Sequence, residues 1–247
     1  MAAIELNSST LINDANLTNY WRFESNVTAT KGSANGTVTG SPTTNTAAEF
    51  GNGLSVPGTT GNYVDFGTST GVPNQFTISF WIKFNDFTTG ATSNQVLPLA
   101  RRDASAANGT WQIGINNGSS ANAWTIEYVF YDGSSFKNKR SNTTGALSTG
   151  VWYFIVGSID VANASNSAIY FNNTSLGLGN DQTSAIFSDA GTQTMRAGWS
   201  DNATAGCNCM LDDVAIWSRK LAANEVNYLY TGIPINTPKN LTLLNAG

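Results

Sequence analysis

One stretch of the sequence decides the fold, and it reads Leu211-Asp212-Asp213-Val214-Ala215-Ile216-Trp217-Ser218-Arg219-Lys220-Leu221. It predicts a strand that is followed directly by a short closing helix. In the strand, Asp212, Val214 and Ile216 are expected to share one face, because successive side chains point to opposite sides. Val214 and Ile216 need a core, so Asp212 should point inward with them. A buried carboxylate requires a partner, and a cation, an arginine or backbone N–H groups would each serve.

The helix that follows has one apolar stripe. Val226, Leu229 and Tyr230 are spaced i, i+3 and i+4, which places them on the same side of a helix. Glu225 falls in the first turn, where the helix dipole favours a negative charge. Gly232 suits the position at which the helix ends.

The rest of the chain reads as strands separated by loops rich in Gly, Ser, Thr and Asn. The clearest strand covers residues 76–84, where large apolar side chains alternate without a break. In residues 124–131, four apolar side chains lie on one side, and Glu127 and Tyr131 lie on the other. We count about eleven to thirteen such strands and no helical pattern before Lys220, so the sequence predicts an all-β protein of two packed sheets.

The composition points to a surface that is polar without being charged. Charged residues make up 11% of the chain and the net charge is −4, whereas typical domains have about 25% charged residues. This balance excludes nucleic-acid binding, which needs clustered Lys and Arg. No run of 18 apolar residues exists, so membrane insertion is not expected. Surfaces of this kind are typical of extracellular, cell-surface or virion proteins.

Side chains for catalysis are scarce. The sequence has no histidine, which excludes Ser-His-Asp and Cys-His arrangements and histidine-ligated zinc. The Glu-x-Asp-x-x-Glu pattern that is typical of glycosidases built on two packed β-sheets is absent. Asp212 and Asp213 are adjacent, so a regular strand would point them to opposite faces and away from a shared sugar bond. We therefore expect a protein that is not an enzyme, and a divergent glycoside hydrolase is the alternative.

The chain divides into three parts. Residues 1–16 look irregular and polar, and residues 17–232 form one domain. Residues 233–247 contain two prolines within a short distance, which marks a linker, and their last part resembles the first strand of an Ig-like or fibronectin-III-like module. We therefore expect a longer, modular parent chain.

Several short motifs, in their order along the chain, resemble the laminin-G-like (concanavalin A-like) jelly-roll family. They are Tyr20-Trp21-Arg22-Phe23-Glu24, Phe50-Gly51-Asn52-Gly53-Leu54, Tyr63-Val64, Phe76-Thr77-Ile78-Ser79-Phe80-Trp81-Ile82-Lys83, Gly150-Val151-Trp152-Tyr153-Phe154, Ile169-Tyr170-Phe171-Asn172-Asn173 and Leu211-Asp212-Asp213-Val214-Ala215-Ile216-Trp217. The resemblance implies a two-sheet antiparallel jelly-roll sandwich with a short C-terminal helix. It also implies binding of glycans or protein partners, often near a Ca²⁺ at a sheet edge.

The resemblance makes Asp212 a candidate metal ligand. Asp212 matches a position that such domains use either for calcium or for anchoring the first strand. Ala29 and Pro57 stand where relatives usually carry Asp. The oxygens left nearby belong to Asp212, Glu24, Asn26 and backbone carbonyls, against the six to eight that Ca²⁺ prefers. A Ca²⁺ site at these residues is one expectation, and a hydrogen-bonded Asp212 is the other. The calcium reading predicts that Ca²⁺ raises the melting temperature and that Asp212→Ala abolishes the rise.

The candidate ligand-binding residues are an acceptor and three large rings. Glu127 and Tyr131 pair a carboxylate with a ring on one strand face, and Trp111 and Tyr153 could add rings for stacking on a sugar. The same side chains would also fit a core or a solvated sheet face. The leading hypothesis is a non-catalytic recognition or adhesion module, a lectin of the cell or virion surface that binds a glycan or a surface protein. A structural spacer domain without a ligand is the alternative.

Overall fold

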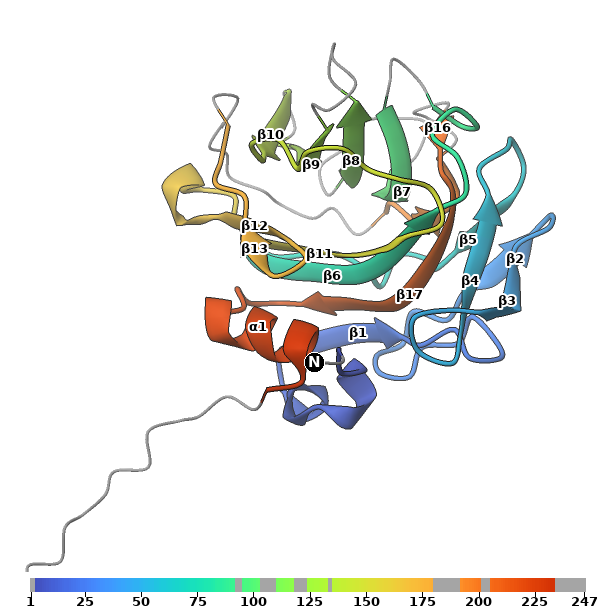
Figure 1. Ribbon diagram of the computed structural model, residues 1–247, viewed down its shortest axis with the longest axis horizontal. Helices are drawn as coiled ribbons and strands as arrows, with labels where there is room; N and C mark the ends of the chain where they lie inside the picture. The colour runs from blue at the N-terminus through green and yellow to red at the C-terminus, as the bar shows by residue number, and fades with distance from the viewer. Residues whose placement is uncertain are drawn as a thin grey trace, which may run out of the picture.

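The computed structural model describes residues 3–91, 95–102, 110–117, 124–132, 135–179, 192–200 and 205–233. Within them two antiparallel sheets face each other (Figure 1). Sheet A has the order β13 (Thr174–Ser175), β12 (Ala168–Phe171), β11 (Trp152–Asp160), β6 (Gln75–Phe84), β17 (Asn208–Trp217), β4 (Asn52–Pro57) and β3 (Thr43–Ala47), with β1 (Leu17–Trp21) also paired to β17. Sheet B has the order β10 (Phe136–Arg140), β9 (Trp124–Tyr131), β8 (Trp111–Asn117), β7 (Gln95–Arg101), β14 (Met195–Ala197), β5 (Tyr63–Asp65) and β2 (Thr37–Thr39).

The remaining elements are short. They are the two-stranded pair β15 (Trp199–Ser200) and β16 (Ala205–Gly206), the 3-10 helices η1 (Leu6–Ser8), η2 (Thr10–Asn13) and η3 (Ala164–Asn166), and the helix α1 (Ala223–Thr231). The predicted all-β sandwich with a short C-terminal helix is therefore confirmed. The part of the sequence C-terminal to residue 233, which was predicted to be a linker and the start of another module, lies outside the described residues.

Two apolar cores hold three layers together. The first lies between the sheets and contains the inward side chains of β6, whose alternation was evident in the sequence: Phe76, Ile78, Phe80, Ile82 and Phe84. The second lies on the other side of sheet A, beneath α1 and the N-terminal segment. Figure 1 shows these two segments below β17, on the side of sheet A that faces away from sheet B.

The N-terminal segment is part of the second core. Residues 3–16, which the sequence suggested to be irregular, contain η1 and η2. Leu6 and Leu11 are buried there beside α1 residues Val226 and Leu229. These two leucines are five residues apart among polar residues. No helical or strand period therefore predicted their burial. The segment therefore packs as a cap on sheet A.

The closing helix begins and ends where the sequence predicted. The Glu225 carboxylate accepts a hydrogen bond from the Ala222 amide at 2.8 Å, and Gly232 ends the helix with a φ of 68°. The Tyr230 ring stacks on the Trp81 ring of sheet A at 5.8 Å between centroids. The predicted stripe thus packs against the sheet through both aliphatic and aromatic contacts.

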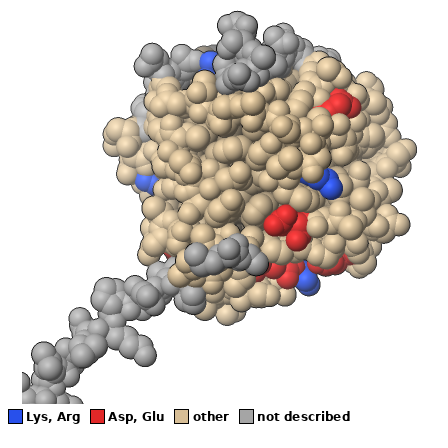
Figure 2. Space-filling view, in the orientation of Figure 1, with Lys and Arg blue, Asp and Glu red and all other residues tan. Residues whose placement is uncertain are grey.

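Charged side chains are sparse on the surface, as the composition requires. Figure 2 shows that most of the face in view is uncharged and that the acidic groups form a few separate patches. No helix among the described residues is long and apolar enough to cross a membrane.

Candidate functional site

The outer face of sheet B carries a cluster of polar and aromatic side chains. On β9, Ile126, Tyr128 and Phe130 point into the core between the sheets, so Glu127 and Tyr131 lie on the opposite, outer face. Both residues were predicted candidates, and the structure brings them to the same face. We call the surface formed by the outward side chains of β7–β10, together with Arg102 just after β7, the sheet-B face.

Glu127 lies at the base of this face and holds three neighbouring side chains. Its carboxylate accepts hydrogen bonds from Asn116 Nδ2 at 2.9 Å, Asn138 Nδ2 at 2.5 Å and Arg140 Nη2 at 3.1 Å. These donors come from the strands on both sides of β9. Glu127 itself is 5% exposed, so it orients the polar groups above it and presents little of its own surface.

An aromatic patch lies beside these polar groups. The Phe136 ring of the edge strand β10 packs edge-on against Tyr131 at 5.1 Å between centroids. Phe136 is 44% exposed, which is unusual for a ring this large. The Arg102 guanidinium lies 4.9 Å from the Phe136 ring centre and donates a hydrogen bond to Gln112 Oε1 at 2.8 Å. The sheet-B face thus offers ring surface next to oriented donors.

Two of the predicted ligand-binding residues do not reach this face. Trp111 is 2% exposed, shares the core with Ile113 and Ile115, and donates its indole N–H to the Thr70 carbonyl at 3.3 Å. The prediction that Trp111 contacts a ligand is therefore wrong. Strand alternation carried the signal, since Trp111 shares the face of those two isoleucines.

Tyr153 is also a core residue. Its ring stacks with Phe171 at 5.1 Å and is 7% exposed, while its hydroxyl accepts a hydrogen bond from the Ser148 amide at 2.9 Å. Its proposed stacking on a sugar is wrong for the same reason as that of Trp111. The sequence analysis also missed Phe136, Asn138 and Arg140, because β10 is too polar and too short to stand out as a strand.

The acidic pair on β17 has a geometry that the sequence did not predict. Asp212 pairs with Trp81 of β6, and Ala215 pairs with Ser79. Between these two pairs β17 contains one more residue than β6. This is a β-bulge, and Asp213 has a φ of 52° there. The expectation that Asp212 shares a face with Val214 was wrong because the bulge shifts the alternation.

The bulge turns both carboxylates to the second core. Asp212 Oδ2 accepts a hydrogen bond from the Phe50 amide at 2.8 Å. Asp213 Oδ2 accepts one from the Leu6 amide at 2.7 Å, and Asp213 Oδ1 accepts one from the Tyr20 hydroxyl. The prediction that the two aspartates point to opposite faces was therefore wrong. Backbone N–H groups, one of the three expected kinds of partner, satisfy the buried Asp212.

The bulge also lies where β17 changes partners. Residues 208–211 of β17 pair with β4, and residues 214–217 pair with β1. The carboxylates at the junction bind Phe50, just before β4, and Tyr20 in β1. This pair therefore anchors both strands and the N-terminal segment to the centre of sheet A.

Burial dominates the protonation of the pair. Burial raises the pKa of Asp212 to about 8, and the neighbouring charges of Asp213 and Glu24 add to the shift. Burial likewise raises the pKa of Asp213 to about 7, although hydrogen bonds from Tyr20 and Leu6 oppose it. Both groups thus hold a proton at a pH where an exposed aspartate has lost it.

The candidate metal ligands do not fit a calcium ion. Glu24 Oε2 accepts a hydrogen bond from the Asn52 amide at 3.0 Å, and the Arg22 guanidinium lies 3.4 Å from Glu24 Oε1. Asn26 Oδ1 accepts one from the Thr28 amide at 2.8 Å. No group of three or more His, Cys, Asp or Glu side chains gathers into a metal site in the described part of the chain. Amide N–H groups bind one oxygen of Asp212, one of Glu24 and that of Asn26, and the Arg22 cation lies at the other oxygen of Glu24, whereas Ca²⁺ needs six to eight oxygens directed at one point.

We expect the melting temperature to stay the same when Ca²⁺ or EDTA is added to the metal-stripped protein. The physical reason is that Asp212 and Glu24 both accept hydrogen bonds from backbone amides at residues 50–52, and Glu24 also pairs with the Arg22 cation, so Ca²⁺ would have to displace these partners. Differential scanning fluorimetry at millimolar Ca²⁺ measures this directly. A rise that disappears in Asp212→Ala would establish the calcium site instead.

Comparison with proteins of known structure identifies the fold. Domain 4 of an extracellular arabinanase from Geobacillus stearothermophilus, solved in complex with arabinotriose, matches with a TM-score of 0.64 and 17% identity, over 87% of this chain and 98% of that domain. The binding domain of botulinum neurotoxin serotype D matches with a TM-score of 0.62 and 18% identity, over 88% of this chain. The chain spans 52% of that domain, about half its length. A further structure of the serotype D ligand-binding domain, in complex with N-acetylneuraminic acid, has a TM-score of 0.61 and 18% identity, over 88% of this chain and 51% of that one.

At these identities the structural matches establish the fold alone. No curated protein sequence matches the chain. The family model described as the concanavalin A-like lectin/glucanases superfamily matches residues 57–227, which is more than half of the chain. The chain therefore belongs to the concanavalin A-like lectin/glucanases superfamily.

Proposed function

We propose that this domain is a non-catalytic glycan-binding module that uses the sheet-B face. One observation carries the proposal: the exposed Phe136 ring, packed on Tyr131, lies beside polar side chains that Glu127 holds in place. A ring face suits the C–H side of a sugar, and amide and guanidinium groups suit its hydroxyls. The module would act outside the cell, as part of a larger surface protein.

The comparisons support the proposal by analogy. The arabinanase domain was solved with arabinotriose and the toxin domain with N-acetylneuraminic acid. Since fold does not give function, the case depends on the side chains of this chain. Arg102 and Arg140 are cationic, and their guanidinium groups can bind either the hydroxyls of a neutral sugar or the carboxylate of an acidic one.

The test is a glycan array followed by calorimetric titration of the best ligand, with arabinotriose included as a probe. We expect the double variant Tyr131→Ala, Phe136→Ala to weaken binding by about tenfold or more, because central aromatic contacts each contribute over about 1 kcal/mol. Val151→Ala is the matched control, since Val151 is 46% exposed and directly precedes β11 of sheet A, not a strand of sheet B. Binding that survives the double variant would remove the sheet-B face from the proposal.

A structural spacer is the second candidate. The burial of Glu127 beneath Asn116, Asn138 and Arg140 favours it, because a fully satisfied carboxylate needs no ligand. Failure of the wild-type protein to bind any glycan, together with an empty cell-surface pull-down, would support the spacer. The non-catalytic part of the proposal predicts no release of sugar from a panel of polysaccharides, and measurable release would revive the hydrolase alternative.

A further inference from the structure

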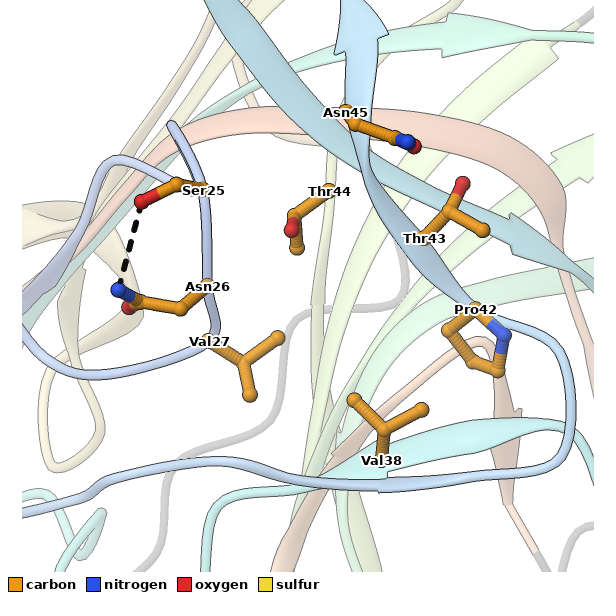
Figure 3. A pocket seen from close by; sticks show the side chains of 8 residues that line it. All are labelled: Ser25, Asn26, Val27, Val38, Pro42, Thr43, Thr44 and Asn45. Atoms are coloured by element: carbon orange, nitrogen blue, oxygen red, sulfur yellow. Dashed lines mark hydrogen bonds between the residues drawn. The ribbon is translucent and has the colours of Figure 1, made fainter.

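A pocket lies at the edge where both sheets end. β3 is the last strand of sheet A, β2 is the last strand of sheet B, and a short turn joins them. Between them and the loop after β1 is a cavity of about 430 Å³. We call it the edge pocket, and Figure 3 shows its lining residues: Ser25, Asn26, Val27, Val38, Pro42, Thr43, Thr44 and Asn45. β2 lies at the opposite end of sheet B from β10, so the edge pocket is separate from the sheet-B face.

A second β-bulge lies in β3, within the strand residues that line the edge pocket. Thr43 pairs with Ser55 of β4 and Thr46 pairs with Gly53, so β3 uses one extra residue over this interval. All three residues Thr43, Thr44 and Asn45 line the edge pocket. Figure 3 shows the Thr44 side chain directed toward Ser25 and Asn26, and those of Thr43 and Asn45 directed to the other side of the strand. Bulges are frequent next to functional sites.

The lining selects a neutral ligand that forms hydrogen bonds. Ser25, Thr43 and Thr44 supply hydroxyl groups, and Asn26 and Asn45 supply amides, each of which can donate and accept. Val27, Val38 and Pro42 supply small apolar surfaces. Among the described residues, the lining contains no charged side chain that could pair with an anion or a cation, and no aromatic ring that would favour a flat aromatic ligand.

Some of these polar groups are already oriented. Asn26 Nδ2 donates a hydrogen bond to Ser25 Oγ at 3.5 Å, which Figure 3 draws. Asn26 Oδ1 accepts one from the Thr28 amide at 2.8 Å. These two contacts restrict rotation of the Asn26 amide. Preorganised donors and acceptors lower the entropy cost of binding a ligand.

The edge strands are poor templates for an added peptide strand. Exposed strand edges can recruit another strand through backbone hydrogen bonds. β2 has only three residues, and the bulge interrupts β3 inside the pocket. Both features oppose a continuous ladder. The volume lies within the range of small-molecule sites, which is about 300–1,000 Å³.

We propose that the edge pocket binds a single neutral sugar residue or a polyol of similar size. Alternating hydroxyl and C–H groups on such a ligand match the hydroxyl, amide and small apolar groups of the lining. Val38, which is 45% exposed although it is apolar, would be covered by the ligand. This site does not depend on the sheet-B face.

The test is an NMR titration of the full chain with methyl glycosides of glucose, galactose, mannose, N-acetylglucosamine and arabinose. Each is added up to about 50 mM, which is about ten times a Kd of about 5 mM. We expect at least one of them to shift the amide signals of residues 25–27, 38 and 43–45 with saturation. Glucuronic acid is the charged control, and we expect it to bind more weakly. Thr44→Ala and Asn45→Ala should each weaken binding several-fold.

Two variants make the test decisive. Val38→Trp should fill the edge pocket and abolish the saturable shifts, and the NMR spectrum itself reports that the domain is folded. Thr46→Ala is the matched control, because Thr46 is an exposed threonine on the same strand that does not line the pocket. Absence of saturable shifts with all five glycosides, or shifts that persist in Val38→Trp, would overturn the proposal.

The result separates the two proposed sites. The double variant Tyr131→Ala, Phe136→Ala should leave titration of the edge pocket unchanged. Loss of those shifts in this variant would show that they report ligand on the sheet-B face, which would overturn the edge site and leave the proposed function intact. Loss in Val38→Trp alone supports the edge site whatever the sheet-B face binds.

Discussion

Replacing Asp213 with alanine is expected to lower the free energy of unfolding by about 3 kcal/mol or more. The change removes the acceptor for the Leu6 amide and the Tyr20 hydroxyl, both buried. An unsatisfied buried donor costs about 1–3 kcal/mol. Alanine must also adopt the left-handed conformation that Asp213 has at a φ of 52°, which costs about 1 kcal/mol or more.

Urea denaturation at pH 6 measures this effect, with Asp213→Asn as the matched control. Asparagine resembles the protonated carboxyl, keeps an oxygen acceptor and tolerates a positive φ. Its loss of stability should therefore be well under half that of alanine. Equal losses for the two variants, or a loss below about 0.5 kcal/mol for alanine, a level typical of surface substitutions, would contradict the anchoring role of Asp213.

The free energy of unfolding is expected to fall as the pH rises from about 4 to about 8. The pKa of Asp212 is raised to about 8 and that of Asp213 to about 7, in both cases mainly by burial. In the unfolded chain both carboxyls titrate near about 3.9. Between these values the folded state binds more protons, so stability decreases with pH. Each group contributes a slope of at most about 1.4 kcal/mol per pH unit.

Denaturation curves across this pH range test the prediction. Asp212→Asn and Asp213→Asn should each flatten the slope, because each removes one titrating group. Asp86→Asn is the matched control. Burial raises the pKa of Asp86, but hydrogen bonds from the Thr89 and Thr88 amides outweigh burial and lower this pKa to about 2. Its contribution is lost only as the pH falls below about 4, so the slope above pH 5 should not change. A slope of the opposite sign, or one unchanged in the double Asn variant, would contradict the assignment.

Strand alternation predicted much of the sheet-B face. The sequence placed Glu127 and Tyr131 opposite the apolar side of β9, and both lie on the outer face of sheet B. The same rule places Trp111 and Tyr153 in the core, where both lie. Their selection as ligand contacts was wrong because ring chemistry was given more weight than face. Large rings are buried by default.

Polar strands escaped prediction for a physical reason. β2, β3 and β10 are edge strands, and edge strands need no alternating apolar face because solvent covers much of them. Their place is set by backbone pairing with β5, β4 and β9. Both the edge pocket and the Phe136 ring lie on these strands, so neither could be predicted from an alternating pattern in the sequence.

The sequence by itself determined the all-β class, the course of the buried strands and the closing helix, because the periods of two and of 3.6 residues are local properties of the chain. Only the tertiary structure decided where the carboxylates of Asp212 and Asp213 point. A bulge forms there because β17 must leave β4 and pair with β1, and that requirement comes from strands more than 150 residues away. The bulge of β3 lies within a hairpin of consecutive strands, but the edge pocket also needs Val38 of β2 and the loop at residues 25–27, and only the tertiary structure brings these to β3.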